Sequence, residues 1–330
     1  MQVIQKEVGP NKAQLTIYLQ TQSKELSTAA IRPAVLIFPG GGYFVCSDRE
    51  AEPVALAYLA EGFNAFVLRY TVGEKERFQD AFEDAEAALR ELRAHAAEWH
   101  IDAAKIAVAG FSAGGHLAAC LGTAEGERPN ALILGYPVIK AEMGPPVNKE
   151  LWAADERVTE DTPPTFLFST SDDNVVPVEN SLAFAAALAR HNVYFELHVY
   201  LTGEHGVSLA KAATANGQAA MVNPPVAEWF SQSVRFLQQL WGDFPLKQAP
   251  PPAPVRDRAA LPLDTPIKRL LQDKQSRAVL TQCLPGVLDR ILANPMAHGL
   301  SLNQMAEFAG LLLPPEVLDH VRQELDKLKK

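Results

Sequence analysis

The chain has 330 residues, of which 48% are hydrophobic and 21% charged, as expected of a globular protein with a sizeable core. Its formal net charge of −9 argues against nucleic acid or an anionic membrane as a standing partner. No apolar run approaches the length of a membrane span, and the N-terminus lacks a basic region followed by an apolar core. We therefore expect a cytoplasmic protein, or a secreted or periplasmic one if a signal peptide has been removed.

Short apolar or alternating runs predict strands along the first 240 residues. In chain order they lie at 13–19, which alternates like an edge strand, and at 34–38, 64–70, 106–109, 131–134, 165–170 and 194–200. Amphipathic patterns predict helices between them, at about 48–62, where Ser47 or Asp48 is the expected cap, and at 78–99, 115–121, 178–191 and 223–240. Strands that alternate with helices indicate an α/β fold with a mostly parallel central sheet and helices on both faces.

The composition changes after residue 244. Seven prolines occur between Pro245 and Pro266, which is typical of a semi-rigid extended linker or a strap. Only helical patterns follow, at 267–280, at 287–292, after a capping box at 301–304, and at 316–328. We predict a catalytic domain at 1–244, a linker at 245–266 and a small all-helical C-terminal domain at 267–330, whose helices are a candidate surface for self-association.

The stretch from Lys105 to Cys120 combines a buried strand, an abrupt turn and a helix around Gly110-Phe111-Ser112-Ala113-Gly114. This is the setting of a G-x-S-x-G nucleophile elbow, in which the serine hydroxyl is lifted above the carboxyl edge of the sheet. Ser112 is therefore the predicted nucleophile. Its position at a helix N-terminus also favours negative charge that develops nearby.

A serine hydroxyl needs a base, and the base needs an orienting carboxylate, in the chain order Ser, acid, His. After the strand at 165–170 stand Asp172 and Asp173, and Asp173 is the predicted acid, with Asp172 as the alternative. The competing interpretation is that both only cap or turn before the next helix. His205, between Gly203 and Gly206 after the last strand, is the predicted base. The histidines at 191, 198 and 205 do not share a helical face, so no metal site is expected.

The oxyanion of an acyl-transfer intermediate requires backbone amides. Ala113, directly after the nucleophile, supplies one, and the glycines at 40–42 after an early buried strand can supply the rest. Tyr43, Phe111 and His116 adjoin these motifs and are the candidate pocket residues. For His116, one helical turn after Ser112, a packing role is the alternative.

Residues 31–240 resemble the acetyl-esterase and hormone-sensitive-lipase-like branch of the α/β-hydrolases, and in particular bacterial proteins associated with xylan breakdown. The resemblance rests on four motifs, at 39–43, 110–116, 173–177 and 204–206. It implies an α/β-hydrolase fold, hydrolysis of short acyl esters, commonly acetyl groups on sugars, and no cofactor. It also favours Gly41 and Gly42 over Gly40 in the oxyanion hole. Two departures are Pro39, where lipase-like members carry His, and the short segment at 137–163, where many members carry a cap.

The leading hypothesis is thus a serine carboxylesterase that deacetylates sugars or short xylo-oligosaccharides. A broad-specificity esterase for small aliphatic esters is the closest alternative. A serine peptidase of the same fold usually carries a large upstream domain, and the ~30 residues before the first core strand leave no room for one. A glycosidase needs two carboxylates that face each other across a sugar, which neighbouring Asp172 and Asp173 do not offer. A non-catalytic binding protein is disfavoured because all three triad positions are filled.

Overall fold

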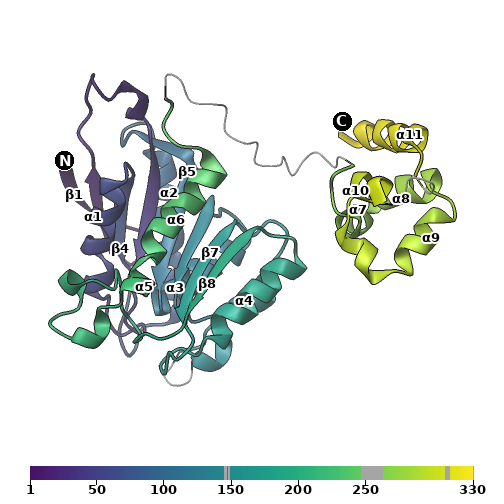
Figure 1. Ribbon diagram of the computed structural model, residues 1–330. Coiled ribbons are helices and arrows are strands. Elements are labelled where there is room, and N and C mark those ends of the chain that lie inside the picture. The colour runs from purple at the N-terminus through teal and green to yellow at the C-terminus, as the bar shows by residue number, and fades with distance from the viewer. Residues whose placement is uncertain (145–146, 148, 247–262, 309–312, 330) are drawn as a thin grey trace. The chain divides into compact units, whose positions relative to one another are not determined.

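The structure is a computed structural model that describes residues 1–144, 147, 149–246, 263–308 and 313–329 (Figure 1). The chain divides into two compact units, Met1–Pro250 and Pro251–Lys330. This division falls within the predicted proline-rich segment at 245–266, of which residues 247–262 lie outside the described part. Each unit is considered by itself below.

The first unit is built on one eight-stranded sheet with the order β1-β2-β4-β3-β5-β6-β7-β8 (Figure 1). The strands are β1 (Gln2–Val8), β2 (Ala13–Leu19), β3 (Arg32–Phe38), β4 (Asn64–Arg69), β5 (Ile101–Phe111), β6 (Ala131–Gly135), β7 (Thr165–Thr170) and β8 (Phe195–Tyr200). From β4 to β8 every neighbouring pair is parallel, whereas β2 is antiparallel to both of its neighbours. The predicted mostly parallel sheet is confirmed.

The prediction that residues 13–19 form the edge strand is wrong. β1 covers this segment and is itself the edge, next to β2. β2 is consequently an inner strand, in which Leu15 and Ile17 are fully buried. The sequence of β1 hides its role because most of its side chains are exposed and many are polar, and only Val8 and, in part, Ile4 reach the core beside its backbone pairing with β2.

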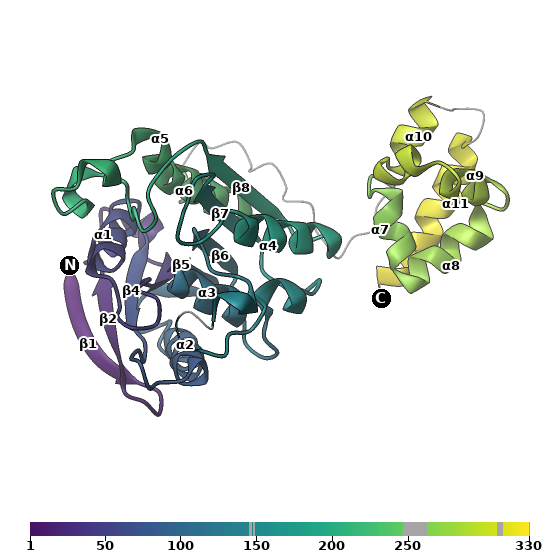
Figure 2. The same ribbon diagram turned by 90° about the horizontal axis from the view of Figure 1, so that it is seen from below.

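Helices cover both faces of the sheet (Figure 2). One face carries α1 (Glu52–Ala60), α5 (Pro224–Ala227) and α6 (Trp229–Trp241), and the other carries α2 (Phe78–Ala94), α3 (Ala113–Thr123) and α4 (Glu179–Arg190). The sheet has a hydrophobic core on each face, and successive residues of the central strands point into alternate cores. In β3, Leu36 packs into one core and Val35 and Ile37 into the other. This alternation explains why β3 reads as a continuous apolar run, since both of its faces are covered.

Three helix predictions differ from the structure in detail. Neither Ser47 nor Asp48 caps α1: a short 3₁₀ turn, η2 (Asp48–Glu50), comes first, and the residue before the helix, Ala51, makes no side-chain cap bond. α2 ends at Ala94 rather than 99. The helix expected at 223–240 is interrupted at Glu228, which leaves the short α5 before α6.

The second unit contains α7 (Ile267–Gln272), α8 (Lys274–Cys283), α9 (Val287–Leu292), α10 (Leu302–Phe308) and α11 (Pro315–Asp326), around a hydrophobic cluster of its own. The single helix expected at 267–280 is two helices, because the Asp273 carboxylate caps α8 by accepting the Ser276 N–H at 2.7 Å. The predicted capping box is confirmed: Ser301 and Gln304 exchange side-chain to backbone hydrogen bonds at the start of α10. Within the described residues, no helix combines the length and apolarity needed to cross a membrane.

Candidate active site

Ser112 stands in the turn between the end of β5 and the start of α3, in a strained conformation with φ 52° and ψ −118°. The turn is tight enough to require glycine two residues later. A Cβ on Gly114 would lie 2.1 Å from the Phe38 carbonyl oxygen, so any side chain there would push β3 away from the helix. This crowding raises the Ser112 hydroxyl above the sheet while leaving the residue only 8% exposed.

The structure brings the three predicted triad residues together from three separate loops. His205, after β8, has its Nε2 2.8 Å from Ser112 Oγ, and its Nδ1 is 2.7 Å from Oδ2 of Asp173, between β7 and α4. In the neutral tautomer that fits both contacts, the serine hydroxyl donates to Nε2 and Nδ1–H donates to the carboxylate. The His205 side chain is 15% exposed and that of Asp173 1%, so the site opens to solvent at the histidine and serine only.

Asp173, and not Asp172, contacts the histidine. Burial opposes ionisation of Asp173, but its hydrogen bond to His205, the charge of that ring and the N–H groups of Val176 and Val175, which donate to Oδ1 at 2.9 Å each, outweigh burial and lower its pKa. Asp172 is exposed and instead accepts the Gly203 N–H at 2.9 Å, which ties its loop to the one that carries His205.

The glycine loop after β3 presents amides beside the serine. Gly41 (φ 126°) and Gly42 (φ 64°) both have left-handed backbones, and a Cβ on Gly41 would lie 2.2 Å from the Val45 carbonyl oxygen. The Gly40 amide is already used, because it donates to Oε2 of Glu50 at 2.8 Å. In the described part of the chain the Gly41 and Gly42 N–H groups have no protein acceptor, and Ala113 is the first residue of α3, whose N–H has no partner within the helix.

The three side chains predicted to line the pocket are buried instead. Phe111 and His116 have no exposed surface and Tyr43 is 2% exposed. Tyr43 donates its hydroxyl hydrogen bond to His116 Nδ1 at 2.8 Å, and His116 Nε2–H donates to the Trp152 carbonyl at 2.8 Å. Burial lowers the His116 pKa to about 4, although the hydrogen bond to Trp152 opposes this. His116 therefore stays neutral and supports the site from behind, which agrees with its alternative interpretation as a packing residue.

Two residues at the site were not found from the sequence. Glu50 is 2% exposed and lies beneath the glycine loop, and Tyr136, at the end of β6, is 3% exposed and places its ring 5.0 Å from that of His205. Tyr136 follows Gly135 at the carboxyl end of a buried strand. The triad candidates were predicted from the same kind of position, so this one could have marked Tyr136 as a candidate site residue. Glu50 comes shortly after Ser47 and Asp48, which resemble helix caps. The sequence therefore suggests a capping turn at this point rather than a buried carboxylate.

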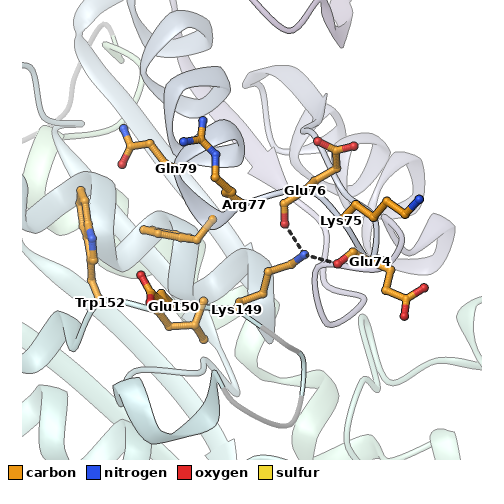
Figure 3. A pocket seen from close by; sticks show the side chains of 10 residues that line it. Glu74, Lys75, Glu76, Arg77, Gln79, Lys149, Glu150 and Trp152 are labelled. Atoms are coloured by element: carbon orange, nitrogen blue, oxygen red, sulfur yellow. Dashed lines mark hydrogen bonds between the residues drawn. The ribbon is translucent and has the colours of Figure 1, made fainter.

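A cavity of about 980 Å³ lies between the loop after β4 and the segment before β7 (Figure 3). Polar side chains make up much of its lining, among them Glu74, Glu76, Arg77, Gln79 and Glu150, together with Phe78 and Trp152. Lys149, 8% exposed, spans it with its Nζ donating to the carbonyl oxygens of Gly73, Glu74 and Glu76.

Buried aromatic side chains separate the cavity from the serine. The Phe78 ring packs 5.9 Å from Tyr43 and 5.0 Å from His116. Tyr43 follows Gly42, and the His116 amide donates to the Ser112 carbonyl. None of the three triad residues lines the cavity. Among the described residues, no group of three or more His, Cys, Asp or Glu side chains is arranged to hold a metal ion.

Two family models match the chain. The BD-FAE model matches residues 15–134, and that of the prolyl oligopeptidase family matches residues 146–223. The first covers the glycine loop and Ser112, and the second covers Asp173 and His205. Together they take in the strands from β3 to β8, apart from Gly135 at the end of β6.

Among curated proteins, the chain is 34% identical over 209 residues to endo-1,4-β-xylanase B of Butyrivibrio fibrisolvens, a match to 54% of this chain and 33% of that protein. It is 30% identical over 195 residues to the acetylxylan esterase of Xylanibacter ruminicola, a match to 52% of this chain and 40% of that protein. The chain thus matches less than half the length of each of these curated relatives.

Solved structures match over nearly their full length. MGS-M1, an α/β-hydrolase from a Medee basin deep-sea metagenome library, is 43% identical with a TM-score of 0.69, covering 73% of this chain and 98% of that one. The acetyl ester-xyloside bifunctional hydrolase of Caldicellulosiruptor lactoaceticus is 34% identical with a TM-score of 0.61, covering 71% of this chain and 90% of that one.

Proposed function

The chain belongs to the α/β-hydrolase family, and we propose that it is a serine carboxylesterase that removes short acyl groups, acetyl above all, from sugars or xylo-oligosaccharides. The observation that carries the proposal is the pair of contacts made by His205, 2.8 Å to Ser112 Oγ and 2.7 Å to Asp173 Oδ2. A histidine held between a serine hydroxyl and a buried carboxylate is the arrangement that acyl transfer needs.

The proposed mechanism follows from these contacts. Ser112 Oγ attacks the ester carbonyl carbon while His205 Nε2 takes its proton, and Asp173 stabilises the imidazolium that results. The oxyanion accepts hydrogen bonds from the Gly41, Gly42 and Ala113 amides. His205 then protonates the leaving alcohol, and an acyl group remains on Ser112. Water, activated by the same imidazole, releases the acid and restores the serine.

The relatives and the cavity both support a carbohydrate as the alcohol half. The names of two relatives refer to acetylxylan and to an acetyl ester-xyloside, and these substrates are proposed here for this chain. The cavity lined by Phe78 and Trp152 offers carboxylates, a guanidinium and an amide, which suit a ligand that bears several hydroxyl groups (Figure 3). Since buried aromatic side chains lie between this cavity and Ser112, we assign to it an outlying sugar of an oligosaccharide rather than the acetylated one.

The test compares acyl and alcohol preference in one experiment. Initial rates are measured on p-nitrophenyl acetate, butyrate and octanoate, and acetate release is measured from acetylated xylo-oligosaccharides, for the wild type and for Ser112→Ala. We expect the highest kcat/KM on acetyl esters, acetate release from the oligosaccharide, and neither activity in the variant.

Two outcomes would change the assignment. Faster turnover of butyrate with no oligosaccharide release would indicate a broad-specificity aliphatic esterase. The match to the prolyl oligopeptidase family is the reason to include aminoacyl p-nitroanilides as well, and turnover of these in preference to esters would indicate a peptidase.

A further inference from the structure

The feature that the mechanism above leaves unused is a buried carboxylate directly beneath the site. Glu50 is 2% exposed and comes from η2, between the glycine loop and α1. Its Oε2 accepts the Gly40 N–H at 2.8 Å, and its Oε1 accepts the Tyr136 hydroxyl at 2.6 Å. Burying a carboxylate is unfavourable unless hydrogen bonds or an opposite charge compensate for the lost water.

The hydrogen bonds around Glu50 fit its ionised form. The Gly40 N–H can only donate, so Oε2 must accept. The Tyr136 oxygen already accepts the Ser208 N–H at 3.0 Å, so its own proton points to Oε1. A proton on Oε1 would leave the Tyr136 hydroxyl proton without an acceptor in this network, and a proton on Oε2 would itself meet no acceptor in it. Burial raises the Glu50 pKa, while the bonds from Tyr136 and Gly40 and the nearby His205 oppose that rise.

Through these bonds one carboxylate joins three segments of the site. Gly40 begins the loop that carries the Gly41 and Gly42 amides, Tyr136 directly follows β6, and Ser208 lies three residues after His205 in the same loop. The Ser208 hydroxyl also donates to the Arg49 carbonyl, beside Glu50. A displacement of Glu50 would therefore move the oxyanion amides relative to the histidine.

We propose that Glu50 is a positioning residue for the esterase reaction: it fixes the oxyanion loop against the His205 loop and places a second negative charge beneath the imidazole. The Tyr136 ring, edge-on to His205 at 5.0 Å, lies between the two groups. The titratable groups that face Glu50 are Tyr136 and His205 across the site, Tyr70 at the end of β4, and Arg49 next to it in the chain. The inference rests on the proposed function, because it assigns a role in that same chemistry.

The test uses two substitutions that separate position from charge. Glu50→Gln keeps the shape but removes the charge and one acceptor. Tyr136→Phe keeps the carboxyl group but cuts the link to Ser208 and removes one of the hydrogen bonds that hold Glu50 ionised. The matched control is Glu52→Gln, the same change at an exposed position in the first turn of α1. Thermal midpoints of all variants show whether each one folds.

We expect Glu50→Gln to lower kcat on p-nitrophenyl acetate about 10- to 100-fold, less than the ~10²–10³ loss of a whole oxyanion donor, with KM changed by less than about threefold. Without the charge the imidazolium is less favoured, so the acid limb of the kcat/KM profile moves to lower pH, by on the order of half a unit to one unit. Tyr136→Phe should lower kcat and move that limb in the same direction by no more than Glu50→Gln does, because it weakens the charge of Glu50 without removing the carboxyl group. Glu52→Gln should change neither.

The reaction of Ser112 with a fluorophosphonate gives a readout that needs the serine and histidine but no particular acyl substrate. We expect Glu50→Gln to slow this labelling as it slows turnover. A wild type that labels but hydrolyses no ester contradicts the proposed function alone. A folded Glu50→Gln protein with wild-type labelling rate and an unmoved pH profile overturns the role of Glu50, and so does a fall in kcat matched by Glu52→Gln.

Discussion

His116 makes the stability of the first unit depend on pH in a way that can be calculated. Burial lowers its pKa from the ordinary value of 6.5 to about 4. In the unfolded chain the imidazole takes up its proton near pH 6.5, whereas in the folded chain it resists protonation until about pH 4. The stability that its neutral form contributes is thus fully present above pH 6.5 and is lost as the pH falls towards 4. The window of about 2.5 pH units, at 1.36 kcal/mol each, amounts to about 3 kcal/mol.

The matched variant is His116→Gln, whose amide can accept from Tyr43 and donate to the Trp152 carbonyl without titrating. Urea unfolding is followed at pH 7, 6, 5 and 4 by tryptophan fluorescence, since the four tryptophans all lie at 99–241 in the first unit. Between pH 7 and 4 the unfolding free energy of the wild type should fall by about 3 kcal/mol more than that of the variant. Other titrating groups are common to both proteins and cancel in the difference. Parallel curves would refute the reasoning.

The remaining predictions concern the reaction and the cavity. Asp173→Asn should lower kcat on p-nitrophenyl acetate by ~10⁴, because the histidine loses its orienting anion, whereas Asp172→Asn should stay within about threefold of wild type; equal losses would refute the assignment of the acid. Gly41→Ala should lower kcat by ~10²–10³, since its Cβ meets the Val45 carbonyl and displaces the oxyanion amides, and rates near wild type would argue against that loop. Lys149→Met should lower the unfolding free energy by about 1–3 kcal/mol in urea titrations, because its ammonium group donates to backbone carbonyls. It should also raise KM for acetylated xylo-oligosaccharides but not for p-nitrophenyl acetate, and equal effects on the KM of both substrates would place the sugar elsewhere.

The central strands were the part of the fold most accessible to sequence reasoning. β7 begins and ends where the sequence predicted, because Phe166 and Phe168 pack into one core and Leu167 into the other, which gives the strand an apolar centre on both faces. β1 escaped the same reasoning, since it is an edge strand with mostly exposed side chains beside β2. Helix ends were also missed where capping is not done by a side chain, as at Ala51 before α1. Local sequence patterns therefore predict strands that are buried on both faces. They miss strands whose side chains are mostly exposed and helix ends that have no side-chain cap.

The candidate triad could be located for a different reason: the fold fixes the order of its residues along the chain. Ser112, Asp173 and His205 each follow a parallel strand, and the carboxyl ends of such strands share one edge, so spacing along the chain becomes proximity in space. Glu50 and the side chains around His116 follow no such rule. Their positions depend on which loop folds beneath the glycine turn, and this is decided by packing between segments some 70 to 90 residues apart, as in the Glu50–Tyr136 contact.

This difference bears on how the site achieves its geometry. A strained serine turn and a left-handed glycine loop are both unfavourable locally, and neither can hold its shape without support. The support is polar and buried: Glu50 accepts from the glycine loop, and Tyr43 binds the imidazole of His116 behind the serine. Since an unpaired buried polar group is penalised far more than a paired one is rewarded, each of these contacts is held in a single arrangement rather than a range of them. The residues that touch the substrate can therefore remain small, while the precision of the site resides in buried groups that never meet it.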